Sequence, residues 1–339
     1  MARLRVAVIM GGRSSEHDIS VASARSVVDA LDPERYDVRA VEIGQDGRWQ
    51  LDPPAEPGQI GKGGETLPVP ADGSPSPFEG VDVVFPVLHG PFGEDGTVQG
   101  FLELADVAYV GAGVTASALC MDKDLFKAVM RDKGVPVVNS VTVLDRHRDR
   151  VENPFGFPVV VKPARLGSSV GISIVKEPEQ LGPAIDLALE HDEKILLEEF
   201  VGGVEVECSV LGNEEPIASI PGEIVPLSSD WYDFCAKYDE GGMELVIPPR
   251  IDERTIARVQ ELAVAAFVAS DCEGMARVDF FVRENGEVVV NELNTIPGFT
   301  ATSVYAKLFE ASGIPYAELL DRLVELALER RDRRARLKY

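Results

Sequence analysis

Residues 4–18, LRVAVIMGGRSSEHD, decide the fold class at the start of the chain. The apolar run over residues 4–10 is typical of a buried strand, and Gly11 and Gly12 end it. A helix should follow, with Ser20 as its N-cap and one apolar face made of Val21, Ala24, Val27, Val28 and Leu31. Strand, glycine turn and helix predict a doubly wound parallel sheet with a ligand edge at this turn. The turn lacks the GxGxxG pattern, which argues against a nicotinamide cofactor.

Periodicity along the rest of the chain predicts an α/β protein that is α+β in part, with three domains over residues 1–120, 121–213 and 214–339. Strands are expected at residues 38–43, 48–51, 81–88, 137–143, 157–162, 194–200, 204–211, 276–282 and 288–293. Helices are expected at residues 97–104, 122–131, 179–189, 252–269 and 316–329. We expect strands 194–200 and 204–211 to pair as a hairpin. Residues 52–77 should form a surface loop, and residues 330–338 a solvated basic tail.

The formal net charge of −24 bears on the classes of partner. A strongly acidic protein repels nucleic acid and anionic membrane surfaces, so neither is expected as a partner. A nucleotide ligand would instead need lysines, arginines or Mg²⁺ gathered at one place. The four cysteines show no paired spacing, and neither a targeting signal nor a membrane span is visible in the sequence. These features favour a cytoplasmic protein with reduced thiols.

The turn signal at residues 284–286 (ENG) predicts that strands 276–282 and 288–293 pair as a hairpin. The most informative constellation spans these two strands, at residues 277–279 (RVD) and 291–294 (NELN). Period two places Arg277 with Asp279 on one face of the first strand, and Glu292 with Asn294 on one face of the second. Two carboxylates and an amide oxygen are ligands that suit Mg²⁺. The alternative is a surface ladder in which Arg277 pairs with Glu292.

Four further segments carry candidate chemistry, each with an ordinary structural alternative. Residues 162–171, KPARLGSSVG, deliver a lysine into a loop of small residues that suits phosphate oxygens, although a flexible loop would look similar. Residues 196–205 end an apolar strand in acceptors that suit adenine and ribose, or else form a solvated acidic turn. Residues 11–18 place Glu16 where it can hold an ammonium group or cap a helix. Residues 89–96, HGPFGEDG, place His89 at a strand end, as a substrate contact or a passive hydrogen-bonding group.

Taken in order, these motifs resemble the D-alanine–D-alanine ligases of the ATP-grasp superfamily, from about Val6 to Leu328. The resemblance rests on GGRSSEHDIS (11–20), HGPFGEDG (89–96), MDKDLFK (121–127), VVKPARLGSSVGI (160–172), AKY (236–238), ARVDF (276–280) and NELNTIPGFTATS (291–303). It implies a three-domain ATP-grasp architecture and an ATP-dependent ligase that makes D-alanyl-D-alanine for peptidoglycan. A homodimer is implied as well.

The resemblance also implies roles for individual residues. ATP would be bound by Lys123, Lys162, Ser169, Glu198, Glu199, Val201, Glu205, Lys237 and Phe280. Two Mg²⁺ or Mn²⁺ ions would be bound by Asp279, Glu292 and Asn294. D-Alanine and the reacting groups would contact Glu16, His89, Ser168, Tyr238, Arg277, Gly298 and Ser303. Residues 231–242 would close over the site as a lid.

The implied chemistry has two steps, activation of the first D-alanine as an acyl phosphate and attack by the amine of the second. Two other functions stay open from the sequence. One is a ligase that accepts D-lactate and forms a depsipeptide, against which Tyr238 argues. The other is a nucleotide-binding regulatory protein without catalysis, against which Arg277, Asp279, Glu292 and Asn294 argue.

Overall fold

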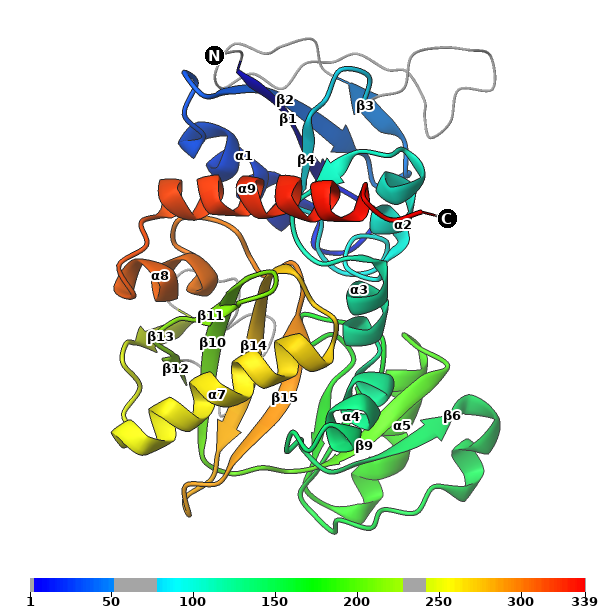
Figure 1. Ribbon diagram of the computed structural model, residues 1–339. Helices are drawn as coiled ribbons and strands as arrows, with labels where there is room; N and C mark the ends of the chain where they lie inside the picture. Colours follow the sequence, from blue (N-terminus) through cyan, green and yellow to red (C-terminus); the bar gives the residue numbers. More distant parts are fainter. Residues whose placement is uncertain (1–2, 52–77, 228–241, 339) are drawn as a thin grey trace.

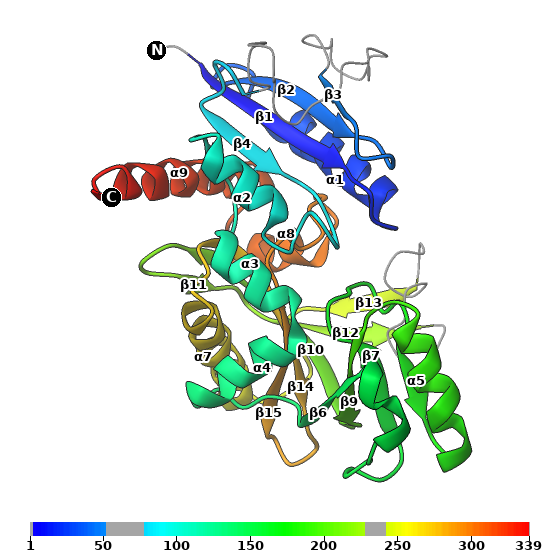
Figure 2. The same cartoon turned by 90° about the vertical axis from the view of Figure 1, so that its right-hand side faces the viewer.

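The structure is a computed structural model that describes residues 3–51, 78–227 and 242–338. Within these ranges the strands form three sheets, one at one end of the molecule and two side by side at the other (Figures 1 and 2). The predicted loop over residues 52–77 and the predicted lid up to residue 241 lie outside the described residues.

The N-terminal sheet is built from β1 (Leu4–Gly11), α1 (His17–Ala30), β2 (Tyr36–Ile43), β3 (Trp49–Leu51), β4 (Val83–Pro86), α2 (Thr97–Leu104) and β5 (Ala108–Tyr109). Its strand order is β3-β2-β1-β4-β5, and all pairs are parallel except that of β3 with β2. Alternate residues of β1 serve two cores, with Val6 and Val8 on the side of α1 and Ala7 and Ile9 on the side of α2. The doubly wound parallel sheet predicted from residues 4–18 is therefore confirmed.

The start of α1 differs from its prediction. The helix begins at His17, so Ser20 lies inside it and is not the N-cap. The Ser20 hydroxyl accepts the Gly11 N–H at 2.7 Å and donates to the carbonyl of Val87. The buried Ser20 thus connects the ends of β1 and β4. Helix periodicity does not reveal this contact, because it depends on residues far apart in the sequence.

The central sheet follows two connecting helices, α3 (Val114–Met121) and α4 (Lys123–Asp132). It contains β6 (Ser140–Leu144), β7 (Val159–Pro163), β8 (Ser173–Val175) and β9 (Lys194–Glu199), with the short helices η1 (Asp145–Arg150) and η2 (Pro178–Gln180) and the helix α5 (Leu181–Leu189). The strand order is β6-β9-β7-β8 and every pair is antiparallel. β6 is shorter than predicted, because Val137 instead bridges to Val290 of the third sheet.

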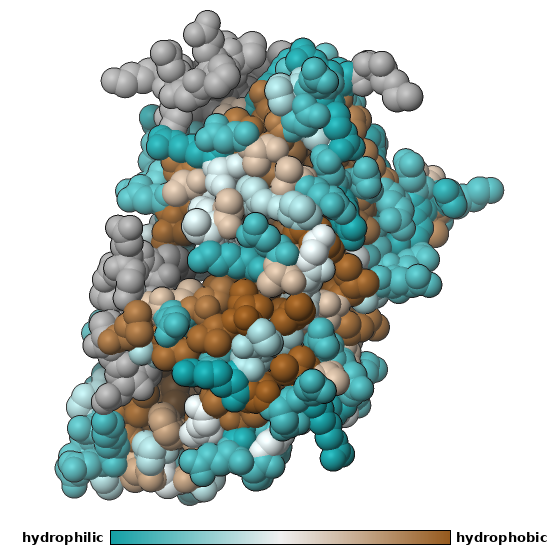
Figure 3. Space-filling model, turned by 90° about the vertical axis from the view of Figure 1, so that its left-hand side faces the viewer, coloured by the Kyte–Doolittle hydropathy of each residue, from teal (hydrophilic) through white to brown (hydrophobic). Residues whose placement is uncertain are grey.

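The C-terminal sheet is built from β10 (Val204–Gly212), β11 (Ile217–Ala218), β12 (Gly222–Pro226), β13 (Met243–Val246), α7 (Glu253–Ala269), β14 (Gly274–Val282), β15 (Val288–Asn294) and α8 (Val304–Ala311). Its order is β13-β12-β10-β14-β15, and the hairpin predicted between β14 and β15 is confirmed. α7 crosses one face of this sheet (Figure 1). An apolar band occupies the face drawn in Figure 3, on the side of β13 and α8.

The hairpin predicted between residues 194–200 and 204–211 is wrong. β9 pairs with β6 and β7, whereas β10 pairs with β14 and β12 in the next sheet. The chain changes sheets at Gly203, whose φ is +130° and where an added Cβ would lie 2.1 Å from the Val282 carbonyl oxygen. β10 is buried over most of its length, so it needs a central place with partners on both edges. By its pairing it belongs with the C-terminal sheet, although it precedes residue 214.

The C-terminal helix α9 (Tyr316–Arg334) crosses back over the N-terminal sheet (Figure 1). The solvated tail predicted from residue 330 onward is wrong for Arg330, because the helix continues and Arg330 is only 3% exposed. Its guanidinium donates to the carbonyls of Gly111 and, at 2.8 Å, of Tyr109, and lies 4.2 Å from the Tyr109 ring centre. Within the described ranges, no helix has the length and apolarity that crossing a bilayer would take.

Replacing Arg330 with Met is expected to lower the free energy of unfolding by roughly 1–3 kcal/mol, because two buried carbonyls lose their donors. Denaturant unfolding followed by circular dichroism measures this change. Arg336→Met, at an exposed position of the tail, is the control and should stay within about 0.5 kcal/mol of the parent chain. Equal stabilities for the two variants would contradict the burial of Arg330.

Candidate active site

Two cavities open beside each other between the sheets. The larger, of about 380 Å³, is lined by residues of the N-terminal and C-terminal sheets and their loops. The smaller, of about 290 Å³, lies between the central and C-terminal sheets. Gly167, Ser168 and Glu292 line both, so a ligand in one cavity would meet a ligand in the other at these residues.

The oxygen-rich pair of strands predicted from the sequence is present at the larger cavity. Across β14 and β15, Arg277 stands opposite Asn294 and Asp279 stands opposite Glu292. Arg277 Nε lies 2.7 Å from Asp279 Oδ1 and 2.9 Å from Glu207 Oε2, and Asn294 Nδ2 donates to Asp279 Oδ2 at 3.0 Å. The alternative of a surface ladder does not fit, because Asp279 and Glu207 are buried and Arg277 faces Asn294.

The same residues supply a donor set that fits Mg²⁺. Asp279 and Glu292 offer carboxylate oxygens, and Asn294 offers an amide oxygen from the neighbouring position on β15. A hard cation takes such oxygens and completes its shell with water and phosphate. In the part of the chain that the structure describes, no group of three or more His, Cys, Asp or Glu side chains could hold a metal. The set of two carboxylates and one amide leaves the remaining positions of a bound cation to water or to ligand oxygens.

Lys123 and Lys162 bring positive charge to the smaller cavity. Both residues are nearly buried, with 6% and 4% of their surface exposed. Lys123 Nζ lies 3.2 Å from Glu292 Oε2, at the border of the two cavities. Lys162 Nζ lies 2.7 Å from Glu198 Oε2 and donates to Asn291 Oδ1 at 3.2 Å. A polyanion that entered this cavity would meet two ammonium groups already held in place.

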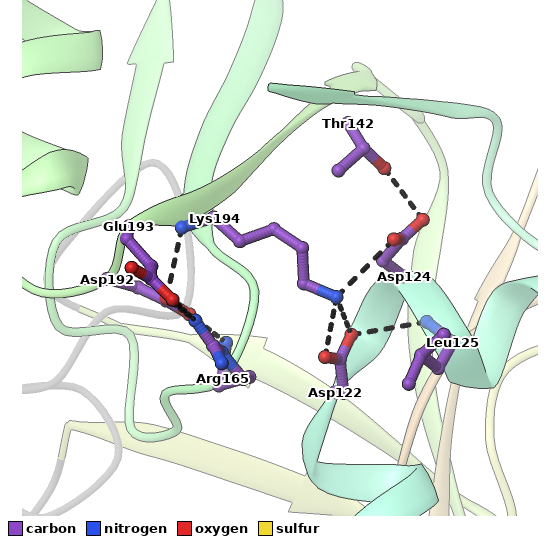
Figure 4. Close-up of polar contacts among 8 residues, drawn as sticks. All are labelled: Asp122, Asp124, Leu125, Thr142, Arg165, Asp192, Glu193 and Lys194. Atoms are coloured by element: carbon purple, nitrogen blue, oxygen red, sulfur yellow. Dashed lines mark hydrogen bonds and ion pairs between the residues drawn. The ribbon is translucent and has the colours of Figure 1, made fainter. Parts of the chain in front are cut away.

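An ion-pair cluster fixes the base of the loop over residues 163–171 (Figure 4). The Arg165 N–H donates to Asp192 Oδ2 at 2.8 Å, and the Arg165 guanidinium pairs with the same carboxylate. Lys194 Nζ donates to Asp122 Oδ1 at 2.6 Å, and Asp122 is the N-cap of α4. The start of the loop and the start of α4 are therefore both tied to the region that begins β9.

The interior of this loop is held in an uncommon conformation. Ser168 and Ser169 both have left-handed backbones, with φ of +54° and +58°. Non-glycine residues adopt this region rarely, and they do so where the surroundings determine it, often at functional sites. Lys123 Nζ donates to the Leu166 carbonyl at 2.8 Å, and the Ser168 hydroxyl donates to Glu16 of the N-terminal domain. The loop thus forms the wall that the two cavities share.

His89 and Glu16 lie in the larger cavity, as predicted for a ligand edge of the parallel sheet. Only 5% of His89 is exposed, and its Nδ1 lies 3.1 Å from the Ile296 carbonyl oxygen. Burial lowers the pKa of His89, which keeps the ring neutral near pH 7. Among the described residues, its buried Nε2 has no hydrogen-bond partner, so it suits a polar group of a ligand.

Gly298 and Ser303 line another side of the larger cavity. The Ser303 hydroxyl accepts the Thr300 N–H at 3.0 Å and lies 2.8 Å from the Thr300 hydroxyl. A Cβ at Gly298 would lie 3.3 Å from Ser303 Oγ, so a side chain there would crowd the serine. The structure thereby gathers Gly298, Ser303, Glu16, His89 and Arg277 at one cavity.

Most residues predicted for the nucleotide line the smaller cavity. These are Lys123, Lys162, Ser169, Glu198, Glu199, Val201 and Glu205. Glu199 is also tied to the C-terminal sheet, because Arg283 Nη2 lies 2.6 Å from its Oε1. Lys237 and Tyr238 lie outside the described residues.

Phe280, which was predicted to contact ATP, does not line the smaller cavity. It has no exposed surface and packs in the core beneath the sheet, whereas its neighbour Phe281 lines the smaller cavity. Period two along β14 places Phe281 on the same face as Arg277 and Asp279. The pattern that located Arg277 and Asp279 could therefore have selected Phe281, but the motif match pointed one position earlier.

Glu94 is a site residue that the sequence analysis missed. The prediction for residues 89–96 named only His89, yet Glu94 lines the larger cavity with Glu16. Its Oε2 accepts the Gly90 N–H at 2.9 Å. Burial and the nearby Glu16 raise the pKa of Glu94 to about 8. An acidic residue in a glycine-rich turn at a strand end was the available signal, as it was for Glu16. Asn291 and Glu207 were missed as well.

Glu94→Gln should change how stability depends on pH. A carboxyl group whose pKa is raised on folding contributes stability that is complete below about pH 4.5 and is lost as the pH rises through about 8. The variant has no proton to lose, and its amide oxygen can still accept the Gly90 N–H. The melting temperature of Glu94→Gln should therefore rise relative to that of the parent chain as the pH increases from about 5 to about 8. Parallel melting curves across this range would contradict a raised pKa.

Comparisons with known proteins agree on one family. Models of the D-ala D-ala ligase N-terminus and C-terminus match residues 5–112 and 129–325. D-alanine–D-alanine ligase A of Mesorhizobium japonicum is 45% identical, covering 97% of this chain and 98% of its own. The enzyme of the same name from Escherichia coli K12 is 43% identical, covering 97% of both.

Two solved structures share the architecture. The D-alanine–D-alanine ligase of Coxiella burnetii has a TM-score of 0.85 and 39% identity, covering 99% of this chain and 97% of its own. The VanG D-Ala:D-Ser ligase of Enterococcus faecalis has a TM-score of 0.83 and 35% identity, covering 96% and 100%. The three-sheet fold is thus the ATP-grasp architecture of these ligases. With two family models and near-complete relatives in agreement, the chain belongs to the D-alanine–D-alanine ligase family.

Proposed function

We propose that this chain joins two D-alanine molecules into D-alanyl-D-alanine at the junction of its two cavities, with ATP as the energy source. Membership of the family makes the chain an ATP-using ligase of peptidoglycan synthesis. One observation supports this location of the reaction: the two cavities meet at Ser168 and Glu292. One cavity offers ammonium groups for a polyanion, and the other offers Glu16 for an ammonium.

We place the nucleotide in the smaller cavity. Lys123 and Lys162 would contact its phosphates, and Ser169 would border them from the loop. The wall made by Glu198, Glu199, Val201, Glu205 and Phe281 would hold adenine and ribose. Lys237, outside the described residues, is proposed as a further phosphate contact. The lid that carries it would exclude water, because water hydrolyses an acyl phosphate.

Asp279, Glu292 and Asn294 are proposed to hold two Mg²⁺ ions, or Mn²⁺, against the phosphates. Bound there, the ions would offset negative charge on the transferring phosphoryl group. Glu292 borders both cavities and pairs with Lys123, which supports a position near the reacting atoms.

The D-alanine molecules would occupy the larger cavity. Glu16, with Ser168 and Tyr238, would hold the ammonium of the first, and Ser303 would hold the carboxylate of the second. His89 Nε2 would accept a hydrogen bond from a substrate N–H, because the neutral ring carries its one proton on Nδ1, toward the Ile296 carbonyl. Arg277 and the Gly298 N–H would donate to the oxyanion that forms at the acyl carbon.

The reaction is then two displacements. The carboxylate of the first D-alanine attacks the γ-phosphorus, the bond to the bridging oxygen breaks, and ADP leaves. The amine of the second D-alanine, once it has lost a proton, attacks the acyl carbon. The bond from that carbon to the phosphate oxygen breaks, which gives the dipeptide and inorganic phosphate.

The domain boundaries 1–120, 121–213 and 214–339 remain proposals, with β10 assigned by its pairing to the C-terminal sheet. The homodimer and the cytoplasmic location also remain predictions. In this division the first domain would bind substrate, and the other two would clasp the nucleotide.

Phosphate release from ATP tests the proposed function. Release should require D-alanine, stay at background with L-alanine or no amino acid, and yield D-alanyl-D-alanine by mass spectrometry. Parallel reactions with D-serine and D-lactate as second substrates test the alternatives. Release that ignores D-alanine would count against the proposal. ATP binding without any turnover would favour a regulatory protein instead.

Glu292→Gln should lower turnover by at least about a hundredfold, the order seen when one electrostatic contributor is removed from a transition state. The dependence of the residual rate on Mg²⁺ should weaken in parallel. Glu284→Gln, at an exposed position on the loop of the same hairpin, is the control and should keep the parent rate. Unchanged turnover in Glu292→Gln would remove the metal assignment.

A further inference from the structure

Lys127 on α4 is a buried cation that no step of the proposed reaction uses. It has no exposed surface, and it lines neither the larger nor the smaller cavity. Its Nζ lies 2.8 Å from Glu198 Oε1 and donates to the Val138 carbonyl at 3.4 Å. Burial lowers the pKa of Lys127 to about 8, because an interior position disfavours the charged form of the amine. The Glu198 carboxylate offsets this charge.

Glu198 connects Lys127 to the nucleotide cavity. Its two carboxylate oxygens are divided between two lysines, Oε1 with Lys127 at 2.8 Å and Oε2 with Lys162 at 2.7 Å. Glu198 itself is 3% exposed. Of the two lysines, Lys162 lines the smaller cavity, while Lys127 is buried on α4 beside the core residue Phe126. The cluster is therefore one carboxylate shared by an inner and an outer ammonium.

This arrangement matters when the outer lysine acquires a second anion. A buried carboxylate that loses its only counter-ion is strongly destabilised. With Lys162 as its sole partner, Glu198 would compete with a phosphate for the same ammonium. Lys127 cannot leave for the cavity, so it keeps the Glu198 charge compensated whichever way Lys162 turns.

We propose that Lys127 is a positioning residue for nucleotide binding, which holds the charge of Glu198 so that Lys162 is available to the ATP phosphates. The inference rests on the proposed nucleotide site in the smaller cavity. It assigns to Lys127 an effect on the affinity for ATP, transmitted through Glu198 and Lys162, without contact with the nucleotide.

The test compares variants by titration with a non-hydrolysable ATP analogue and by steady-state kinetics. Lys127→Met keeps the length of the side chain and removes its charge, and it should weaken binding of the analogue by about tenfold or more. KM for ATP should rise in parallel, while kcat at saturating ATP and KM for D-alanine should change by less than about threefold. Lys162→Met gives the loss expected when the outer lysine itself is removed.

The decisive variant is the double substitution Lys127→Met with Glu198→Gln. Once Glu198 is neutral, Lys162 no longer has a buried carboxylate to satisfy. Because Glu198 also lines the wall proposed for adenine and ribose, the double variant is compared with Glu198→Gln alone, and the affinity that Lys127→Met loses in the parent chain should largely be recovered in the Glu198→Gln background. A purely structural role for Lys127 predicts no such recovery. Arg330→Met, which removes a buried cation that lines neither cavity, controls for lost stability and should leave affinity for the analogue unchanged.

Lys127→Arg keeps the charge and guards against a Met variant that fails to fold. It should keep the affinity for the analogue within about threefold of the parent chain. A folded Lys127→Met with parental affinity, a folded Lys127→Arg that has lost affinity, or an equal loss from Lys127→Met with and without Glu198→Gln would each overturn the inference. Failure of the parent chain to bind the analogue would instead overturn the proposed nucleotide site.

Discussion

The smaller cavity depends on one interaction, the pairing of the Glu198 carboxylate with both Lys127 and Lys162. The chain carries a formal net charge of −24, so its long-range field repels a nucleotide. Buried ammonium groups reverse that field locally, because the interior screens charge poorly. Each cation then needs a partner that lets it persist without a ligand, and Glu198 and Glu292 supply those partners. The carboxylates of Glu198 and Glu292 therefore stabilise the charged lysines of this cavity when no ligand is bound.

The larger cavity depends on contacts between parts of the chain that are far apart in sequence. Ser168 of the central domain donates to Glu16 of the N-terminal domain, and His89 contacts the Ile296 carbonyl of the C-terminal domain. Neither cavity is contained in a single sheet. A ligand at their border would meet Ser168 of the central domain and Glu292 of the C-terminal sheet, with Glu16 of the N-terminal domain bound to Ser168, so the relative placement of the sheets is part of the site. Gly203, where the chain passes from the central to the C-terminal sheet, is one of the positions on which that placement depends.

Local patterns in the sequence were sufficient for the first parallel sheet, the hairpin of β14 and β15, and the grouping of Asp279 with Glu292. Each of these follows from alternation or spacing within a short segment. The features that were wrongly predicted or missed are those whose environment is set by distant parts of the chain. β10 joins a distant sheet because it is buried on both faces, and Arg330 is buried because α9 returns to the first sheet. Glu94 was missed because its pKa is raised by burial and by the charge of Glu16, which is remote in sequence, and both act only in the folded chain.

The return of α9 to the N-terminal sheet has a consequence for how the chain is made. Leu319, Leu320 and Leu323 share a core with Val6 and Phe85 of the parallel sheet. During synthesis the strands of that sheet emerge long before the helix that covers one of their faces. The parallel sheet is thus synthesised before the helix that completes its core, and part of its apolar face stays open until α9 has emerged. Loss of the C-terminal segment would expose that face and invite aggregation, even though every residue lining the two cavities would still be present.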